Sequence, residues 1–227
     1  MRNCIVSIIA AALLLAALAS ASSTAAPAFT DEFLMDRPDM ASSGRNPYFI
    51  LEPGYRMTYK GGDTDLVITV LNETKMVDGV ETRIVEERES EGGQVVEVSR
   101  NYFAISKRNN SVFYFGEDVD DYKDGKVTGH GGSWLAGQNG ARAGVLIPGI
   151  ALIGARYYQE VAPKIAMDRA EVISVTETLT TPAGKFDKVL KTEETSAIES
   201  GKENKYYAPG IGLLKDGDVV LVKYGKV

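Results

Sequence analysis

The residues best suited to chemistry lie in one segment, 116–134, which begins acidic and ends rich in glycine. His130 is the only histidine of the chain, and Ser133 follows three residues later. An imidazole between a hydroxyl and a carboxylate is the arrangement of a serine hydrolase, so His130 and Ser133 with the carboxylates of 117–124 are the weak candidate catalytic group. The nucleophile motif G-x-S-x-G is absent, and a single histidine excludes a multi-histidine zinc site.

The acidic half of this segment also has some features of a calcium-binding loop. Asp118, Asp120 and Asp124 are the candidate metal ligands, because Ca²⁺ prefers carboxylate oxygens. The EF-hand spacing fails, however, since Tyr122 stands where a ligand is needed and Lys123 where the glycine should be. We therefore expect no cofactor, with calcium as the alternative at this acidic turn.

Aromatic residues recur along the strand-like segments of the chain. Trp134, Tyr114, Tyr158 and Tyr207 are the candidate ligand-binding residues. One interpretation is an apolar cavity or a concave sheet face that takes a hydrophobic small molecule. The other is ordinary sheet packing, which aromatic side chains favour in any case.

The first 26 residues have the pattern of a secretory signal peptide. Arg2 gives a positive start, residues 5–18 are apolar apart from Ser7, and small residues suited to cleavage follow up to Ala26. The apolar run is shorter than the roughly 20 residues that span a bilayer. We expect a cleaved leader over 1–26, a flexible N-terminal arm over 27–46, and a mature protein that is periplasmic or secreted without stable membrane insertion.

The leader also contains the only cysteine, Cys4. It precedes the apolar run, so it is not placed for lipidation beside the cleavage site. Its removal leaves a mature domain without disulfides, thiolate metal sites or a cysteine nucleophile. The expected domain must therefore be stable through its core alone.

Composition and charge are those of a globular, mildly acidic protein. The hydrophobic fraction is 44% and the formal net charge is −6. An acidic surface repels phosphate backbones, which makes nucleic acid an unsuitable partner. A hydrophobic small molecule or an envelope protein is the expected partner.

Turn signals at short intervals predict a chain of antiparallel hairpins. Asp78-Gly79 separates two β-branched or alternating segments and is typical of a type I′ hairpin turn. Gly92-Gly93, Asn109-Asn110 and Pro182-Ala183-Gly184 mark similar reversals. Eight of the 23 glycines lie between residues 129 and 154. We predict an all-β domain over 47–227, an antiparallel meander forming a curved sheet or partly open barrel, with 116–154 as a long Gly-rich loop.

Two C-terminal motifs give the chain a resemblance. Residues 182–186 read P-A-G-K-F and residues 206–213 read Y-Y-A-P-G-I-G-L. Together they resemble the signature of exported bacterial β-rich proteins of unknown function. The resemblance implies an antiparallel β fold and an exported location, and it implies no catalytic residue.

The leading functional hypothesis is an uncharacterised, non-enzymatic binding or interaction domain of the cell envelope. It would bind a hydrophobic small ligand or a partner protein through the concave sheet face or the Gly-rich segment. The alternatives are a hydrolase that uses His130 with nearby carboxylates and a calcium-stabilised structural protein.

Overall fold

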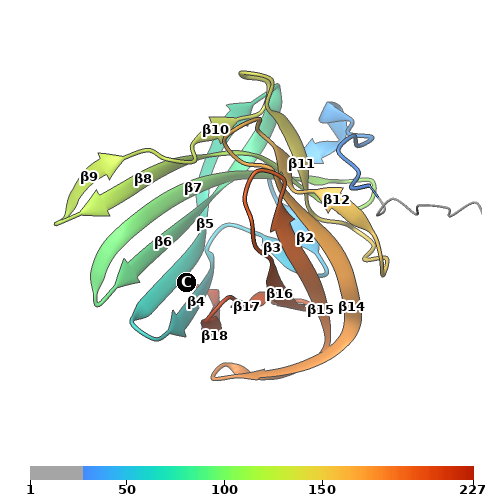
Figure 1. Cartoon of the computed structure of the whole chain (residues 1–227). Helices are drawn as coiled ribbons and strands as arrows, with labels where there is room; N and C mark the ends of the chain where they lie inside the picture. The colour runs from blue at the N-terminus through green and yellow to red at the C-terminus, as the bar shows by residue number, and fades with distance from the viewer. Residues whose placement is uncertain (1–27) are drawn as a thin grey trace, which may run out of the picture.

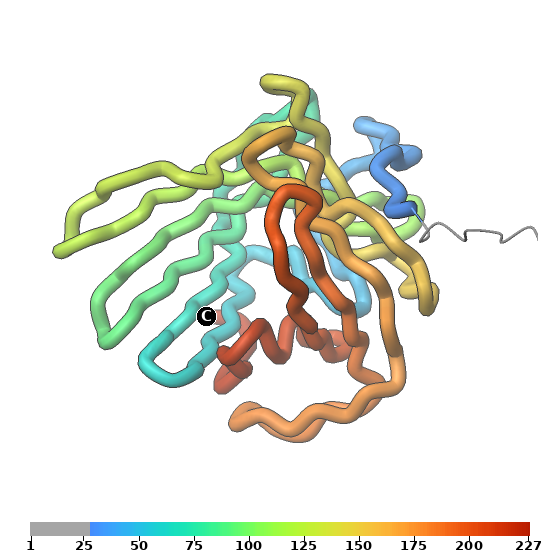
Figure 2. Tube along the Cα trace, in the orientation of Figure 1, coloured from blue at the N-terminus to red at the C-terminus, as the bar shows by residue number. Residues whose placement is uncertain are grey.

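The computed structural model describes residues 28–227, which form a strongly curved antiparallel sheet (Figure 1). Neighbouring strands follow the order β12-β14-β15-β16-β17-β18-β4-β5-β6-β7-β8-β11-β13. The sheet curls until its two ends nearly meet, so that β4 to β11 form one wall and β12 to β18 the other (Figure 2). The predicted all-β meander and partly open barrel are confirmed.

The first wall contains the longest strands of the N-terminal half. Its elements are β4 (Tyr55–Gly61), β5 (Thr64–Val77), β6 (Val80–Glu91), β7 (Gln94–Ser106), β8 (Val112–Lys123), β9 (Lys126–Gly129), β10 (Trp134–Leu135) and β11 (Arg142–Ile147).

The second wall is built from the C-terminal half. Its elements are β12 (Arg156–Tyr158), β13 (Glu160–Val161), β14 (Asp168–Thr181), β15 (Gly184–Ser196), β16 (Glu203–Ala208), β17 (Gly212–Asp216) and β18 (Val219–Lys226).

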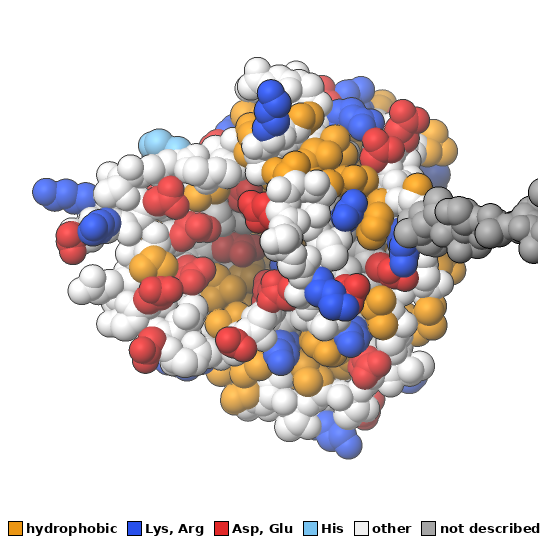
Figure 3. All heavy atoms as spheres, in the orientation of Figure 1, with side chains coloured by type: hydrophobic (Ala, Val, Ile, Leu, Met, Phe, Trp, Pro, Cys, Tyr) orange, Lys and Arg blue, Asp and Glu red, His pale blue; other side chains and the backbone are white. Residues whose placement is uncertain are grey.

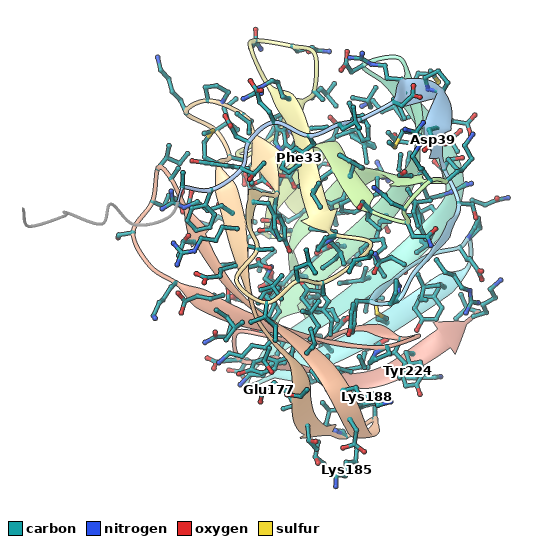
Figure 4. The ribbon with its side chains drawn as sticks, turned by 90° about the vertical axis from the view of Figure 1, so that its right-hand side faces the viewer. Phe33, Asp39, Glu177, Lys185, Lys188 and Tyr224 are labelled. Carbon is teal, nitrogen blue, oxygen red and sulfur yellow. The ribbon has the colours of Figure 1, made fainter. Side chains whose placement is uncertain are left out.

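The hairpin turns form where glycine and asparagine-type residues allow positive φ. Asp78 has φ 47° and Gly79 has φ 77°, as a type I′ turn requires, and Val77 pairs with Val80 across it. Thr181 pairs with Gly184 around Pro182 and Ala183, so the P-A-G-x-F motif is the tip of the β14–β15 hairpin. Figure 4 shows Lys185 and Lys188 projecting from this end of the molecule.

The barrel closes where β11 and β13 approach β12 and β14. Arg142 and Ala143 of β11 pair with Val161 and Glu160 of β13. Gly144 lies at this seam, where a Cβ atom would come within 2.4 Å of the Gln159 carbonyl oxygen. Only glycine allows the strands to approach this closely without a backbone shift.

One end of the barrel is filled by the small hairpin of β2 (Gly44–Asn46) and β3 (Phe49–Leu51). Leu51 is fully buried, and the ring of Phe49 packs 5.2 Å from that of Phe103 on β7. The buried Asn46 side chain donates hydrogen bonds to the carbonyls of Asn110 and Pro148, which fixes the hairpin against two distant loops. The hairpin thereby covers this end of the barrel, and Phe49 contributes to the lining of the interior.

The segment 28–43, which precedes the β2–β3 hairpin, lies along the outer surface of the barrel. It contains the 3₁₀ turn η1 (Arg37–Asp39) and the short strand β1 (Met40–Ala41), which pairs with β7. Phe33 packs edge-on against Phe113, and Figure 4 shows Phe33 and Asp39 on this outer segment. The flexible arm expected over 27–46 therefore has several contacts with the domain within its described part.

The Gly-rich segment 116–154 is more regular than a long loop. It contains the second half of β8 and all of β9, β10 and β11, and its irregular stretches are the β8–β9 turn and residues 130–133, 136–141 and 148–154. Its glycines serve strand pairing: Gly116 lies under β10, where a Cβ atom would come within 2.3 Å of the Trp134 carbonyl oxygen. Glycine concentration here reflects close backbone approach as well as turns.

The predicted leader over 1–26 lies outside the described residues. Within 28–227, no helix is long and apolar enough to cross a membrane.

Candidate functional site

The interior of the barrel holds a cavity of about 300 Å³. In Figure 3 the corresponding face is hollowed at its centre, with acidic side chains around the hollow and hydrophobic atoms deeper inside. The lining residues come from both walls and from the β2–β3 hairpin, and they divide into an apolar floor and a carboxylate layer. The floor comprises Phe49, Met57, Ile68, Val85, Phe103, Tyr114, Leu146, Ala166, Tyr207 and Leu213; the polar layer comprises Glu87, Glu97, Ser99, Asn101, Glu117, Gln159, Glu160, Asp168, Glu194, Lys205 and Asp216.

Strand alternation explains why each strand contributes to both layers. On β6, Val85 and Glu87 are two residues apart and therefore point to the same side of the sheet. On β7, the inward positions run from Glu97 through Ser99 to Phe103, so polarity falls along the strand towards the floor. The chamber is thus apolar at one end and acidic at the other.

Two β-bulges bring further residues inward. On β8, the pairing with β7 shifts between Tyr114, which faces Phe103, and Glu117, which faces Asn101. A residue spacing of three would place these side chains on opposite faces of a regular strand, but the extra residue restores the inward direction. A second register shift separates Tyr206 and Tyr207 of β16, and the extra residue lies on β17. Leu213 and Asp216 of β17 are three residues apart, and this bulge lets both line the cavity.

The apolar floor is built on packed aromatic rings. Phe103 stacks on Tyr114 with ring centroids 4.8 Å apart, and Trp134 meets Tyr114 edge-on at 5.3 Å. The Tyr114 hydroxyl donates to Asn101 Oδ1 at 2.6 Å, which leaves the ring as its apolar contribution to the cavity. A rigid aromatic floor suits an apolar ligand group.

The carboxylate layer carries far more negative than positive charge. Lys205 is the only basic residue of the lining, and its Nζ lies 3.3 Å from Glu194 and 3.1 Å from Asp216. Burial alone would lower the pKa of Lys205, but these carboxylates raise it well above its usual value. The ammonium is therefore already paired within the wall.

The remaining carboxyls hold their protons more tightly than usual. Burial, with the like charges nearby, raises the pKa of Glu87 to about 7 and that of Glu117 to about 7. Burial also raises the pKa of Glu160, which is 4% exposed and accepts a hydrogen bond from the Asp168 backbone N–H. Carboxyls with such values gain or lose protons near neutral pH, so the charge of the cavity depends on pH and on what the cavity contains.

A second hollow lies beside the acidic end of the cavity. A wide hollow of about 600 Å³ is formed largely by residues 194–206 and 215–218, and it shares Asp168, Glu194 and Lys205 with the cavity. The wall that carries these three residues therefore separates the cavity from a hollow on the surface.

The four aromatic residues singled out from the sequence occupy different places. Tyr114 and Tyr207 line the cavity. Trp134 is buried behind Tyr114 and lines a separate pocket of about 220 Å³. Tyr158 lies on the outer side of the seam, where its ring meets Phe29 at 6.3 Å. Two of these four residues are therefore at the cavity itself.

The structure brings His130 to a carboxylate but does not complete a triad. His130 Nδ1 lies 2.9 Å from Asp120 Oδ1 and 3.0 Å from the Val119 carbonyl oxygen. The Ser133 hydroxyl oxygen instead accepts the Val119 backbone N–H at 2.9 Å. The group lies outside the residues that line the barrel cavity.

The three candidate calcium ligands have different surroundings. Asp118 bonds to Lys75 Nζ at 2.9 Å and to the Tyr102 hydroxyl, whereas Asp120 faces His130. Asp124 occupies the β8–β9 turn with φ 52°. Over residues 28–227, no three histidine, cysteine or acidic side chains gather closely enough to hold a metal ion.

Comparisons with known proteins give little guidance. No family model matches the chain, and no curated protein matches it. One solved structure, described as a candidate lipoprotein from Parabacteroides distasonis, is similar at 14% identity and a TM-score of 0.36, over 76% of this chain and 95% of that one.

The sequence-based candidates omitted Glu87 and Glu97, and they included Glu117 only as one of the carboxylates that could accompany His130. Glu87, Glu97 and Glu117 lie on strands whose acidic residues resemble an ordinary solvated face. The available signal was the alternation of side chains along a strand. Glu87 is two residues from the buried Val85, so both lie on the same side of β6. Charged residues on the inward side of a strand are unusual enough to mark a site.

Proposed function

We propose that this protein is a binding protein of the cell envelope that holds a small amphipathic molecule in its barrel cavity. The observation that carries the proposal is the chamber of about 300 Å³ with an aromatic and aliphatic floor and a polar layer at its entrance. This volume is at the lower end of the range typical of ligand pockets. The apolar part of the ligand would pack against Phe103, Tyr114 and Leu213, and its polar end would lie among the carboxyls.

The envelope location rests on the sequence. The leader over 1–26 and the two C-terminal motifs both indicate export. A cysteine-free mature domain with a preformed chamber suits an oxidising compartment, since it needs no reduced thiol. The function is non-catalytic in this account, because the cavity uses carboxyls and aromatic rings rather than the His130 group.

Fluorescence of N-phenyl-1-naphthylamine, an uncharged apolar dye, tests the binding function. Its emission should rise on titration into the wild-type protein, because the dye enters the apolar floor. Leu213→Trp should abolish the rise, since the added indole fills the cavity from β17. Ile173→Trp is the matched control, because Ile173 is 37% exposed on β14 and does not line the cavity.

The circular dichroism spectra of both variants establish that each is folded. If the wild-type protein gives no emission change, or if Leu213→Trp binds the dye as tightly as Ile173→Trp, the cavity is not the binding site.

A further inference from the structure

We propose that the ligand carries a protonated amino group, which Glu87, Glu97 and Glu117 hold above the apolar floor. This inference rests on the proposed binding function and specifies the chemical class of the ligand. The occupant is a primary or secondary organic amine with a compact aromatic or aliphatic body.

The first argument is that these three carboxyls have no cation of their own. None of the three forms an ion pair with another described residue in the cavity, and the one ammonium of the lining, that of Lys205, is held by Glu194 and Asp216. A desolvated carboxylate without a partner is costly. A ligand ammonium would supply the missing charge.

The second argument is that the surrounding groups add to the negative charge. Glu117 lies in the field of Glu97 and Asp168, and Glu87 lies in the field of Asp216, Glu117 and Glu97, opposed by Lys205. An anionic ligand would meet repulsion from every side of the carboxylate layer. The chamber therefore selects against carboxylates and phosphates.

The third argument comes from a polar group buried at the wall. Glu160 is 4% exposed and lines the cavity, with a single backbone N–H from Asp168 bonded to its Oε1 atom. A buried carboxyl can accept more hydrogen bonds than this one, and a ligand ammonium would supply them.

The floor distinguishes an organic amine from a metal ion. A metal ion would occupy only the carboxylate layer and would leave the apolar floor without an occupant. The carboxyls instead surround a space that continues onto Phe103, Tyr114 and Leu213. An ammonium needs hydrogen-bond acceptors spread around it, and its carbon body needs the floor.

Competition against N-phenyl-1-naphthylamine tests this class with three compounds of similar shape. The probes are 2-phenylethylamine, 2-phenylethanol and phenylacetate, which differ in the charge of the polar end. At pH 8 we expect the amine to displace the dye at a concentration at least tenfold lower than the alcohol, and phenylacetate to be the weakest. The preference should shrink at pH 6, because protonated carboxyls no longer attract the ammonium.

Variants of the carboxyls assign the preference to named residues. Glu87→Gln with Glu117→Gln should reduce the amine-to-alcohol ratio at least fivefold, and Glu97→Gln alone should reduce it by less. Glu177→Gln on β14 is the matched control, because Glu177 lies outside the cavity lining near the far end of the molecule (Figure 4).

The outcomes separate the two proposals. Dye binding with equal displacement by amine and alcohol would overturn the amine inference while leaving the binding function intact. An amine preference that the Glu87 and Glu117 substitutions leave unchanged would also overturn it. Failure of the dye to bind would overturn the proposed function itself.

Discussion

Glu117 occupies a position where stability and ligand binding make opposite demands. Its carboxyl is directed into the cavity by a β-bulge, and burial raises its pKa from 4.5 to about 7. Above that pH the folded protein carries an ionised carboxylate in poorly solvated surroundings. Such a group is retained at a cost to stability, as is common for residues at functional sites.

Glu117→Gln should therefore stabilise the empty protein at alkaline pH. At about 1.4 kcal/mol for each unit of pKa, and with a reduction for partial exposure, the free energy of unfolding should rise by roughly 1–2 kcal/mol at pH 8. The gain should be several times smaller at pH 5, where the wild-type carboxyl is protonated in the folded state. Urea unfolding at the two pH values checks this, and an equal effect at both would contradict the assignment.

Lys205 is the one cation of the lining, and its removal should have the opposite effect. Lys205→Met leaves Glu194 and Asp216 without their partner, which should lower the free energy of unfolding by about 2–4 kcal/mol. Adding Glu194→Gln and Asp216→Asn to the same chain should recover most of this loss. Thermal unfolding of the single and triple variants checks the coupling, and additive losses would show that the three groups do not act together.

At the scale of elements, the seam between β11 and the β12–β13 segment decides whether the sheet becomes a chamber. Leu146 on one side of the seam and Gln159 and Glu160 on the other all line the cavity. Gly144 makes this approach possible, because the carbonyl oxygens of Gln159 and Tyr158 would lie 2.4 and 2.6 Å from a Cβ atom.

Gly144→Ala should consequently open the seam and destabilise the protein. The obstructing atoms belong to the backbone and cannot move independently, so a loss of about 2–3 kcal/mol is expected, comparable to overpacking a core. Gly131→Ala is the matched control, because the only neighbour within 4 Å of its Cβ is Asp121 Oδ2 at 3.6 Å. If both substitutions have the same small effect on the melting temperature, the seam does not depend on close strand contact.

The strands and turns were predictable from the sequence because their signals are local. Asp78-Gly79 and Pro182-Ala183-Gly184 form the expected hairpin turns, and alternation near them marks the flanking strands. The segment 116–154 was harder, since its glycines were interpreted as loop residues although several permit strands to approach each other. Close approach depends on the partner strand, which local sequence does not reveal.

The cavity was only partly predictable for a similar reason. Tyr114 and Tyr207 were among the expected ligand-binding residues, but Glu117 and Asp216 face inward only because bulges on β8 and β17 change the alternation. A bulge depends on the register between two strands. Regular side-chain alternation along a single strand therefore assigns these two carboxylates to the wrong side of the sheet.

At the scale of the whole molecule, the interior carboxyls should dominate the pH dependence of stability. The pKa values of Glu87 and Glu117 are both raised from 4.5 to about 7, and those of Glu97 and Glu160 are raised as well. Over pH 5–8 the folded state then binds more protons than the unfolded state, so stability falls as pH rises. Glu52, with its pKa lowered to about 2 by Arg45 and Lys226, acts only at more acidic pH.

Urea unfolding of the wild-type protein at pH 5.5, 7 and 8.5 measures this trend. We expect the free energy of unfolding to decrease through the series, and saturating 2-phenylethylamine to reduce the decrease by neutralising the cavity. A stability that increases from pH 5.5 to 8.5 would show that the interior carboxyls are ionised at little cost.

The central claim is that the barrel chamber is a ligand-binding site, and native mass spectrometry tests it most directly. Wild-type protein and Leu213→Trp would be purified side by side from the cells that naturally produce the protein and sprayed without denaturation. We predict a mass excess of one small basic molecule on the wild-type protein and none on Leu213→Trp. Protein of bare chain mass in both samples, or the same adduct on both, would contradict the account.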